Sequence, residues 1–374
     1  MMIHTQQNSN LSGGQQNPPG SDSSLSRAAH TSVAVALGFI LVLGIFGNFL
    51  LLLVFSRYPG LRTPANLLLV NISISDMLVC LFGTPLSFAA SVRGRWLTGS
   101  CGCRWYGFSN ALFGVVSLVS LSLLSFERYA MTLSGSQLNS SHYRRARLSV
   151  AFSWLYSLAW TLPPLLGWSS YGPEGPGTVC SVQWRRRSVT ARSYIICLFV
   201  FCLLLPLLLM FFCYGRILLA VRGVMRQSQA EGRILLMVVA MVTGYLLCWT
   251  PYAVMAMLAS FGRPGAVPPA AALIPALLAK TSTVLNPVIC VLLNNQVREH
   301  KCVCCNHLLG ALYGMAPPKK HVLDKQQQKK RTAFFTHPGQ VAFGHQVHLL
   351  ERQNKPDKEK KNWTRFLTSA KLVF

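Results

Sequence analysis

Apolar residues along the chain gather in seven long runs that are separated by short polar segments. Each run reaches the roughly 20 residues that a helix needs to cross the hydrocarbon core of a bilayer. The pattern predicts an all-α chain with seven membrane-spanning helices. These helices are expected at about 32–56, 66–92, 101–131, 148–168, 194–220, 233–260 and 270–293.

Polar segments flank the seven runs and divide the chain into four parts. Residues 1–31 are rich in Gln, Asn, Ser, Gly and Pro, so we expect a disordered tail ahead of the transmembrane region at 32–293. Residues 294–305 are expected to form a short amphipathic eighth helix, and 306–374 a basic, disordered cytoplasmic tail. Asn10 opens an Asn-x-Ser sequon, which predicts glycosylation if this tail lies outside.

The composition supports a membrane protein, with 51% hydrophobic and only 12% charged residues. The net charge of +25, from 35 basic against 10 acidic residues, would also suit a nucleic-acid binder. Here the basic residues lie in loops and in the tail between apolar runs. Anionic lipids and cytoplasmic partners therefore fit better, and we expect no nucleic-acid partner.

The basic residues also predict the orientation of the chain, because cytoplasmic loops of membrane proteins carry an excess of Lys and Arg. An extracellular N-terminus places these residues in inner loops: Arg57, Arg62, Arg144, Arg145, Arg147, Arg222, Arg226 and Arg233. The arginines after the fourth run conflict with this orientation, and the pattern offers no account of them. They are Arg185, Arg186, Arg187 and Arg192.

Lys280 lies near the middle of the last apolar run, and no lysine precedes it in the chain. A buried ammonium group is expensive inside a membrane. Its side chain cannot reach the interface, which is about 15 Å away at the rise of a helix. Two interpretations remain: an ion pair with a carboxylate at the same depth, or a nucleophilic amine that forms a Schiff base with an aldehyde.

Single polar, glycine or proline residues recur inside the runs, about one per helix, from Ser32 to Cys305. Their order resembles the rhodopsin-like G-protein-coupled receptors, and Lys280, six residues before Asn286, narrows the resemblance to opsins, whose lysine at this point binds retinal. The matching pieces are Gly47-Asn48, Leu67 to Asp76, Glu127-Arg128-Tyr129, Trp154, Pro206 with Tyr214, Cys248 to Pro251, and Asn286-Pro287.

This resemblance implies a seven-helix receptor of the plasma membrane that is not an enzyme and that binds retinal, in the 11-cis form in the dark. It implies a heterotrimeric G protein as partner, of the Gi/o type, with arrestin as a further candidate. Within opsins the chain most resembles encephalopsin and the teleost multiple-tissue opsins. Two alternatives stay open: a retinal photoisomerase or store without G-protein output, and a receptor for a diffusible ligand in which Lys280 is merely buried.

The resemblance also names the surroundings of the chromophore. It places Gly114, Trp249 and Tyr252 in the pocket wall, with the aromatic residues Phe201 and Phe108 as further candidates. The segment from Pro173 to Ser181 resembles the loop that covers the opsin pocket. A disulfide between Cys103 and Cys180 is implied, and Cys101, two residues away, competes for the same role.

A charged Schiff base needs an opposite charge to keep its proton. In visual opsins this is a Glu three residues after the helix-three cysteine, and Tyr106 stands there in this chain. We therefore predict Glu174 as the counterion, acting through waters and the Tyr106 hydroxyl, with chloride as the alternative. Four acidic residues lie between residues 23 and 298, namely Asp76, Glu127, Glu174 and Glu231. Of these, only Glu174 is expected in the extracellular half of the bundle.

At the cytoplasmic end, Glu127 and Glu231 are expected to hold Arg128 in the resting state, and Tyr214 to receive Arg128 on activation. Tyr129 completes the Glu-Arg-Tyr sequence. The family pattern Asn-Pro-x-x-Tyr begins here with Asn286 and Pro287 but ends in Cys290, which puts the usual contact of its hydroxyl with Tyr214 in doubt.

Three cysteines follow the last run in a basic setting, and we predict palmitoylation at Cys304 and Cys305. A zinc cluster of these two with Cys302 and His307 is the alternative. The three cysteines lack a clear fourth ligand, so we expect no metal site.

Overall fold

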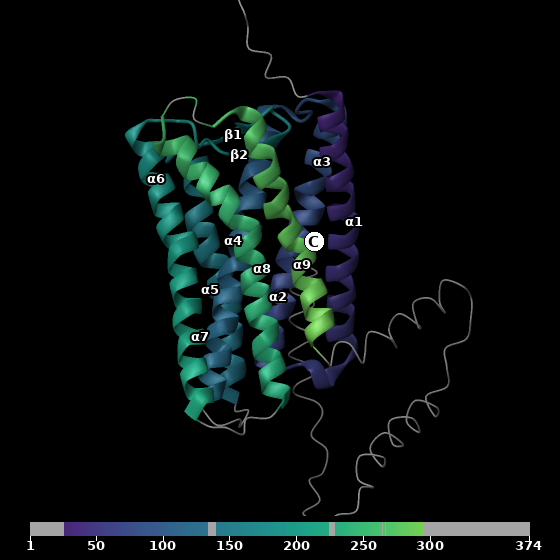
Figure 1. Cartoon of the computed structure of the whole chain (residues 1–374), viewed down its shortest axis with the longest axis vertical. Coiled ribbons are helices and arrows are strands. Elements are labelled where there is room, and N and C mark those ends of the chain that lie inside the picture. The colour runs from purple at the N-terminus through teal and green to yellow at the C-terminus, as the bar shows by residue number, and fades with distance from the viewer. Residues whose placement is uncertain (1–25, 134–139, 224–228, 264, 266, 295–374) are drawn as a thin grey trace, which may run out of the picture. The chain divides into compact units, whose positions relative to one another are not determined.

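The computed structural model describes residues 26–133, 140–223, 229–263, 265 and 267–294. Asn10, the expected eighth helix, Cys304, Cys305 and the C-terminal tail lie outside these residues. The expected seven-helix, all-α bundle is confirmed (Figure 1). Its helices are α1 (Arg27–Arg57), α2 (Pro64–Phe82), α3 (Thr84–Arg93), α4 (Gly99–Leu133), α5 (Ser140–Thr161), α6 (Val189–Phe199), α7 (Leu205–Gly223), α8 (Gln229–Phe261) and α9 (Leu273–Leu293).

Two of the seven spans consist of two helices each. The second span breaks between α2 and α3 at Gly83, next to Pro85, which has no N–H for the helical ladder. The fifth span runs from α6 through a π-helical turn, Val200–Leu204, into α7.

The π-helical turn is linked to Pro206. Within the turn, the N–H of Leu205 bonds to the carbonyl of Val200, five residues back. The next donor in that register would be the N–H of Pro206, which proline lacks, so the carbonyl of Phe201 loses its helical partner. The hydroxyl of Tyr156 on α5 donates to that carbonyl at 2.8 Å instead.

The fourth span differs from its predicted bounds of 148–168. Helix α5 begins at Ser140 and ends at Thr161, just before Pro163 and Pro164. The first turns of α5 contain Arg144, Arg145 and Arg147, so a search for apolar runs places the start of the helix too late. In the described residues, six spans are long and apolar enough to cross a membrane, and α5 falls short because of these polar turns.

Buried polar side chains join the helices. Pro287 leaves the carbonyl of Thr283 without its helical donor, and the amide of Asn48 on α1 donates to it at 2.9 Å. The amide of Asn286 on α9 donates to the carboxylate of Asp76 on α2 at 2.8 Å. These bonds tie α9 to the first two spans.

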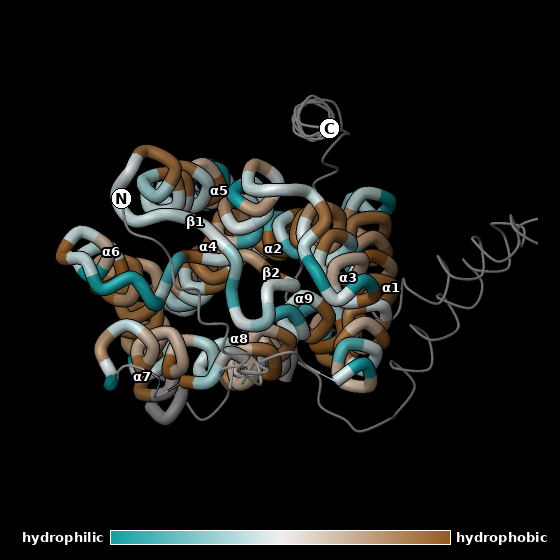
Figure 2. The backbone as a smooth tube through the Cα atoms, turned by 90° about the horizontal axis from the view of Figure 1, so that it is seen from above, coloured by the Kyte–Doolittle hydropathy of each residue, from teal (hydrophilic) through white to brown (hydrophobic). Residues whose placement is uncertain are grey.

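A short hairpin covers the mouth of the bundle at the end where α1 begins. Its strands β1 (Tyr171–Glu174) and β2 (Val179–Val182) pair antiparallel, with Pro173 opposite Cys180. The predicted disulfide between Cys103 and Cys180 is confirmed and fastens β2 to α4, while Cys101 is free and exposed. Seen from above, the hairpin crosses between α4, α8 and α9 (Figure 2).

Candidate functional site

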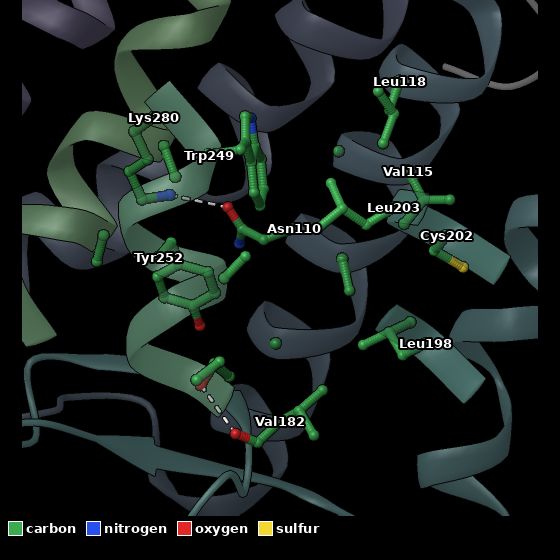
Figure 3. Close-up of a pocket in the computed structure, with 18 of the residues that line it drawn as sticks. Asn110, Val115, Leu118, Val182, Leu198, Cys202, Leu203, Trp249, Tyr252 and Lys280 are labelled. Carbon is green, nitrogen blue, oxygen red and sulfur yellow. Dashed lines mark hydrogen bonds between the residues drawn. The ribbon is translucent and has the colours of Figure 1, made fainter. Parts of the chain in front are cut away.

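A cavity of about 220 Å³ lies below the hairpin, between α4, α6, α8 and α9 (Figure 3). Six of the residues that the sequence predicts for the pocket line it: Tyr106, Gly114, Glu174, Trp249, Tyr252 and Lys280. Much of the remaining wall is aliphatic, including Val115, Leu118, Val182, Leu198 and Leu203. The site is therefore an apolar chamber with an amine on one wall.

Lys280 points into the chamber and bonds to an uncharged partner. Its Nζ donates to Oδ1 of Asn110 on α4 at 2.8 Å and lies 5.2 Å from the centre of the Tyr106 ring. No carboxylate lies within ion-pair distance of it in the described part of the chain. This disfavours a structural ion pair for Lys280. Asn110 was missed from the sequence, where only carboxylates were considered as partners.

Trp249 forms the floor of the chamber beside the proline kink of α8. Its ring stacks on Tyr245 at 5.5 Å and its Nε1 donates to Ser282 on α9 at 3.2 Å. A Cβ on Gly114 would come within 3.3 Å of the Trp249 ring. The glycine on α4 therefore lets this ring lie directly against the α4 backbone.

Glu174 reaches the chamber from the hairpin. Tyr252 donates to its Oε2 at 3.0 Å, and Nε1 of Trp184 donates to the Tyr252 hydroxyl at 3.0 Å. Burial raises the pKa of Glu174, while hydrogen bonds from Ser181 and Tyr252 and the positive charge of Arg185 oppose that rise. The described contacts of the carboxylate are thus with Tyr252 and Ser181, whereas Tyr106 meets Lys280 through its ring.

Phe201 and Phe108 do not line the chamber, so their expected role as wall residues is wrong. Phe201 stacks on Trp160 at 4.6 Å and is 37% exposed on the outer surface of the bundle. It lies in the π-helical turn, whose extra residue shifts the facing of side chains relative to a regular helix. Phe108 packs against Tyr171 of the hairpin instead.

Comparison with known proteins agrees with this geometry. The family model described as 7 transmembrane receptor (rhodopsin family) matches residues 47–289. Pinopsin from Columba livia is 39% identical over 290 residues, which cover 75% of this chain and 83% of the pinopsin. The chain belongs to the opsins. Opsin-3 from Mus musculus is 39% identical to this opsin over 285 residues, covering 73% and 70% of the two chains.

The solved structure of squid rhodopsin superposes on this opsin with a TM-score of 0.72 at 29% identity, covering 84% of this chain and 94% of that one. Opsins are light-sensing, multi-pass membrane receptors that couple to G proteins and carry retinal, and they are not enzymes. Pinopsin and Opsin-3 are equally identical to this opsin, so the percentage identity does not select a subfamily.

The end of the bundle opposite the hairpin, which the sequence predicts to be cytoplasmic, differs from the expected arrangement. Arg145 on α5 holds both carboxylate oxygens of Glu127, at 2.7 and 2.9 Å, and His142 lies 3.4 Å from the same carboxylate. In the described residues Glu127 forms its ion pair with Arg145 on the next helix rather than with the adjacent Arg128. The side chain of Glu231 is outside the described residues.

Tyr214 at this end bonds to α4. Its hydroxyl lies 2.8 Å from the hydroxyl of Ser125. The ring of Tyr129 meets Phe212 edge-on at 5.8 Å, and Phe212 lies two residues before Tyr214 on α7. These contacts hold α7 against α4 near Arg128.

The arginine run after the fourth span has a structural role that the sequence pattern did not reveal. Arg187 donates to the carbonyl of Gly262 at 2.6 Å and Arg185 to that of Val267 at 2.8 Å. Arg186 donates to the hydroxyl of Ser170 at 3.1 Å. Arg185 and Arg187 tie the loop between α5 and α6 to the segment that follows α8, and Arg186 forms a bond within its own loop.

Proposed function

We propose that this opsin holds retinal on Lys280 and uses its photoisomerisation to activate a heterotrimeric G protein. The amine of Lys280 condenses with the aldehyde of retinal to form a Schiff base and release one water, and the nitrogen keeps a proton and a positive charge. The observation that carries the proposal is the placement of Lys280. It is the first lysine of the chain, it is half-buried within the apolar helix α9, and it points into an apolar chamber.

The chamber fits a polyene aldehyde. Its wall is mainly aliphatic and aromatic, which suits a long hydrocarbon chain. The amine bonds to a neutral amide rather than to a carboxylate, so no ion pair holds its nitrogen away from an entering aldehyde. Bound retinal, 11-cis in the dark, supplies the absorption of light and the change of shape.

Glu174 is our candidate for the counterion. It lines the same chamber as Lys280 without an ion pair between them, so its charge acts at a distance. Tyr252, Ser181 and Arg185 each favour its ionised form against the burial that raises its pKa. Chloride is the alternative source of negative charge.

Trp249 connects the chamber to the rest of α8. Its ring lies two residues before Pro251, which bends the helix, and packs against Gly114 across the chamber. A change of shape in the chamber presses on this ring and biases the motion of α8 that exposes the cytoplasmic surface. Arg128 and Tyr214 are then the pair that stabilises the active state.

We infer the setting of the receptor from the same features. The basic inner loops favour a plasma-membrane receptor with an extracellular N-terminus, and they suit contact with anionic lipids. The extracellular disulfide agrees with this orientation. Coupling to a Gi/o-type protein, binding of arrestin and the likeness to encephalopsin and the teleost multiple-tissue opsins follow from the sequence resemblance.

The test is to purify the protein with 11-cis-retinal in the dark and record its spectrum. We expect a visible absorption band that is absent from Lys280→Ala and Lys280→Arg, with membrane insertion unchanged. Pigment at wild-type yield in both variants contradicts the attachment. Light-driven nucleotide exchange on a Gi/o-type protein then separates the receptor from a retinal photoisomerase, which would form pigment without driving exchange.

A further inference from the structure

The amide of Asn110 is fixed between two partners. Its Nδ2 donates to the backbone carbonyl of Tyr106, one helical turn earlier, at 2.7 Å. Its Oδ1 accepts from Nζ of Lys280 at 2.8 Å (Figure 3). Because a carbonyl accepts only from the amide nitrogen, the first bond orients the amide so that its oxygen faces Lys280.

Gly83 provides the space for this amide. A Cβ added at Gly83 would overlap Oδ1 of Asn110 and would lie 2.7 Å from Nδ2 and 2.8 Å from Cγ. The φ of Gly83 is −102°, which any residue can adopt. The glycine at the junction of α2 and α3 is therefore needed for room rather than for backbone freedom, and it keeps the amide of Asn110 beside Lys280.

We propose that Asn110 is a positioning residue for the nitrogen of Lys280 in the pigment, and that it accepts the remaining N–H of that nitrogen. This rests on the proposed attachment of retinal at Lys280. Asn110 supplies a neutral acceptor in direct contact, while Glu174 supplies the negative charge from the hairpin. A single carboxylate beside the nitrogen could supply both the hydrogen-bond acceptor and the negative charge. Here Asn110 supplies the first and Glu174 the second.

The size of the effect follows from the charge of the acceptor. The N–H of the pigment nitrogen carries the positive charge, and its bond to Asn110 forms only while the nitrogen holds its proton, so the bond favours the charged form. Since one pKa unit corresponds to about 1.4 kcal/mol, removal of the amide should lower the pKa of the pigment nitrogen by about one unit. A carboxylate in its place should raise that pKa by at least as much.

The experiment titrates the visible band of the dark pigment in detergent. Asn110→Leu is expected to lower the pKa of the nitrogen by about one unit, and Asn110→Asp, which has the same shape, to raise it. Asn110→Asp should also restore the visible band at neutral pH in the Glu174→Gln background. The matched control is Ser109→Ala, because Ser109 also donates to the Tyr106 carbonyl, at 3.1 Å, but does not line the chamber.

A second measurement tests the role of Gly83. Gly83→Ala should displace the amide and lower the pKa of the nitrogen in the otherwise unchanged chain. It should have no further effect in the Asn110→Ala background, where the added methyl group meets no amide. Equal effects in both backgrounds would show that Gly83 acts on the site by another route.

The outcomes separate this proposal from the proposed function. If Lys280→Ala abolishes the band but Asn110→Leu and Asn110→Asp leave the pKa of the nitrogen unchanged, the role of Asn110 is refuted and the attachment stands. If the wild-type protein forms no band with retinal, both are refuted together.

Discussion

Arg145 on α5 binds Glu127 through two parallel hydrogen bonds, from Nε to Oε2 at 2.7 Å and from Nη2 to Oε1 at 2.9 Å. The side chain of Glu127 is only 2% exposed, whereas that of Arg145 is 36% exposed. Nε of the adjacent Arg128 is buried without a hydrogen-bond partner in the described part of the chain. The acid of the Glu-Arg-Tyr sequence is thus held by the next helix rather than by its neighbour.

Arg145→Gln should destabilise the dark receptor, because a buried carboxylate loses its charged donors. The expected loss is about 1–3 kcal/mol, the range for a hydrogen bond to a charged group. Thermal unfolding in detergent measures it. Glu127, once released, can pair with Arg128, so nucleotide exchange in the dark should fall as well. Arg144→Gln is the control, since Arg144 is exposed, and an equal loss in both variants would remove the role of the ion pair.

Cys103→Ser should lower the yield of folded receptor far more than Cys101→Ser. The bridge from Cys103 fastens the hairpin to α4, and loss of a native disulfide typically costs about 2–5 kcal/mol. Cys101 is exposed and free. The yield of pigment per cell measures both variants, and the reverse order would contradict the pairing.

Glu174→Gln should lower the pKa of the pigment nitrogen, because a nearby negative charge favours its charged form. At neutral pH the variant should absorb in the near ultraviolet, and the visible band should return as the pH falls. Added chloride should restore part of the band by replacing the charge. A pKa equal to that of the wild type would exclude Glu174 as the counterion.

The wild type should show an acid transition of its own that Glu174→Gln lacks. Burial raises the pKa of Glu174, so its carboxylate gains a proton at a higher pH than an exposed Glu does. Protonation removes the negative charge near the nitrogen, and the visible maximum should move to longer wavelength as pH falls.

With the counterion on the hairpin rather than on α4, we also expect the illuminated pigment to stay coloured and to revert with a second photon. Spectra recorded after successive flashes check this.

Cys290→Tyr should increase light-driven nucleotide exchange on a Gi/o-type protein. Cys290 is fully buried on α9, and a tyrosine there supplies the hydroxyl that the family pattern places opposite Tyr214. The initial rate of exchange under saturating light measures the effect. An unchanged or lower rate would mean that Tyr214 is stabilised by other contacts, such as its bond to Ser125.

The sequence predicted the features that depend on one residue type at one depth. Lys280 is of this kind, since a lysine has few other uses inside a membrane, and the resemblance to opsins supplied the disulfide. The sequence did not predict features that depend on which way a side chain faces after an irregular turn, or on a contact from a neighbouring helix. The π-helical turn before Pro206 displaces Phe201, and Arg145 reaches Glu127 from another helix.

Asn110 could have been found from the sequence. Tyr106 stands at the position where visual opsins have their counterion. Asn110 is an uncharged amide that follows one helical turn later, within an apolar run. A neutral amide can accept a hydrogen bond from an ammonium group as a carboxylate does, although it carries no charge. The contacts of the arginine run could not be found in this way, because they end on backbone carbonyls that any sequence supplies.

The bonds from Arg185 and Arg187 to Val267 and Gly262 make α8 a lever with a fixed outer end. The helix runs 22 residues from Pro251 back to Gln229, which is about 33 Å at 1.5 Å per residue. A turn of about 10° at the proline therefore carries the cytoplasmic tip through about 6 Å, while the anchored extracellular segment stays in place. A shift of the Trp249 ring too small to open the chamber is in this way amplified into a displacement large enough to admit another protein.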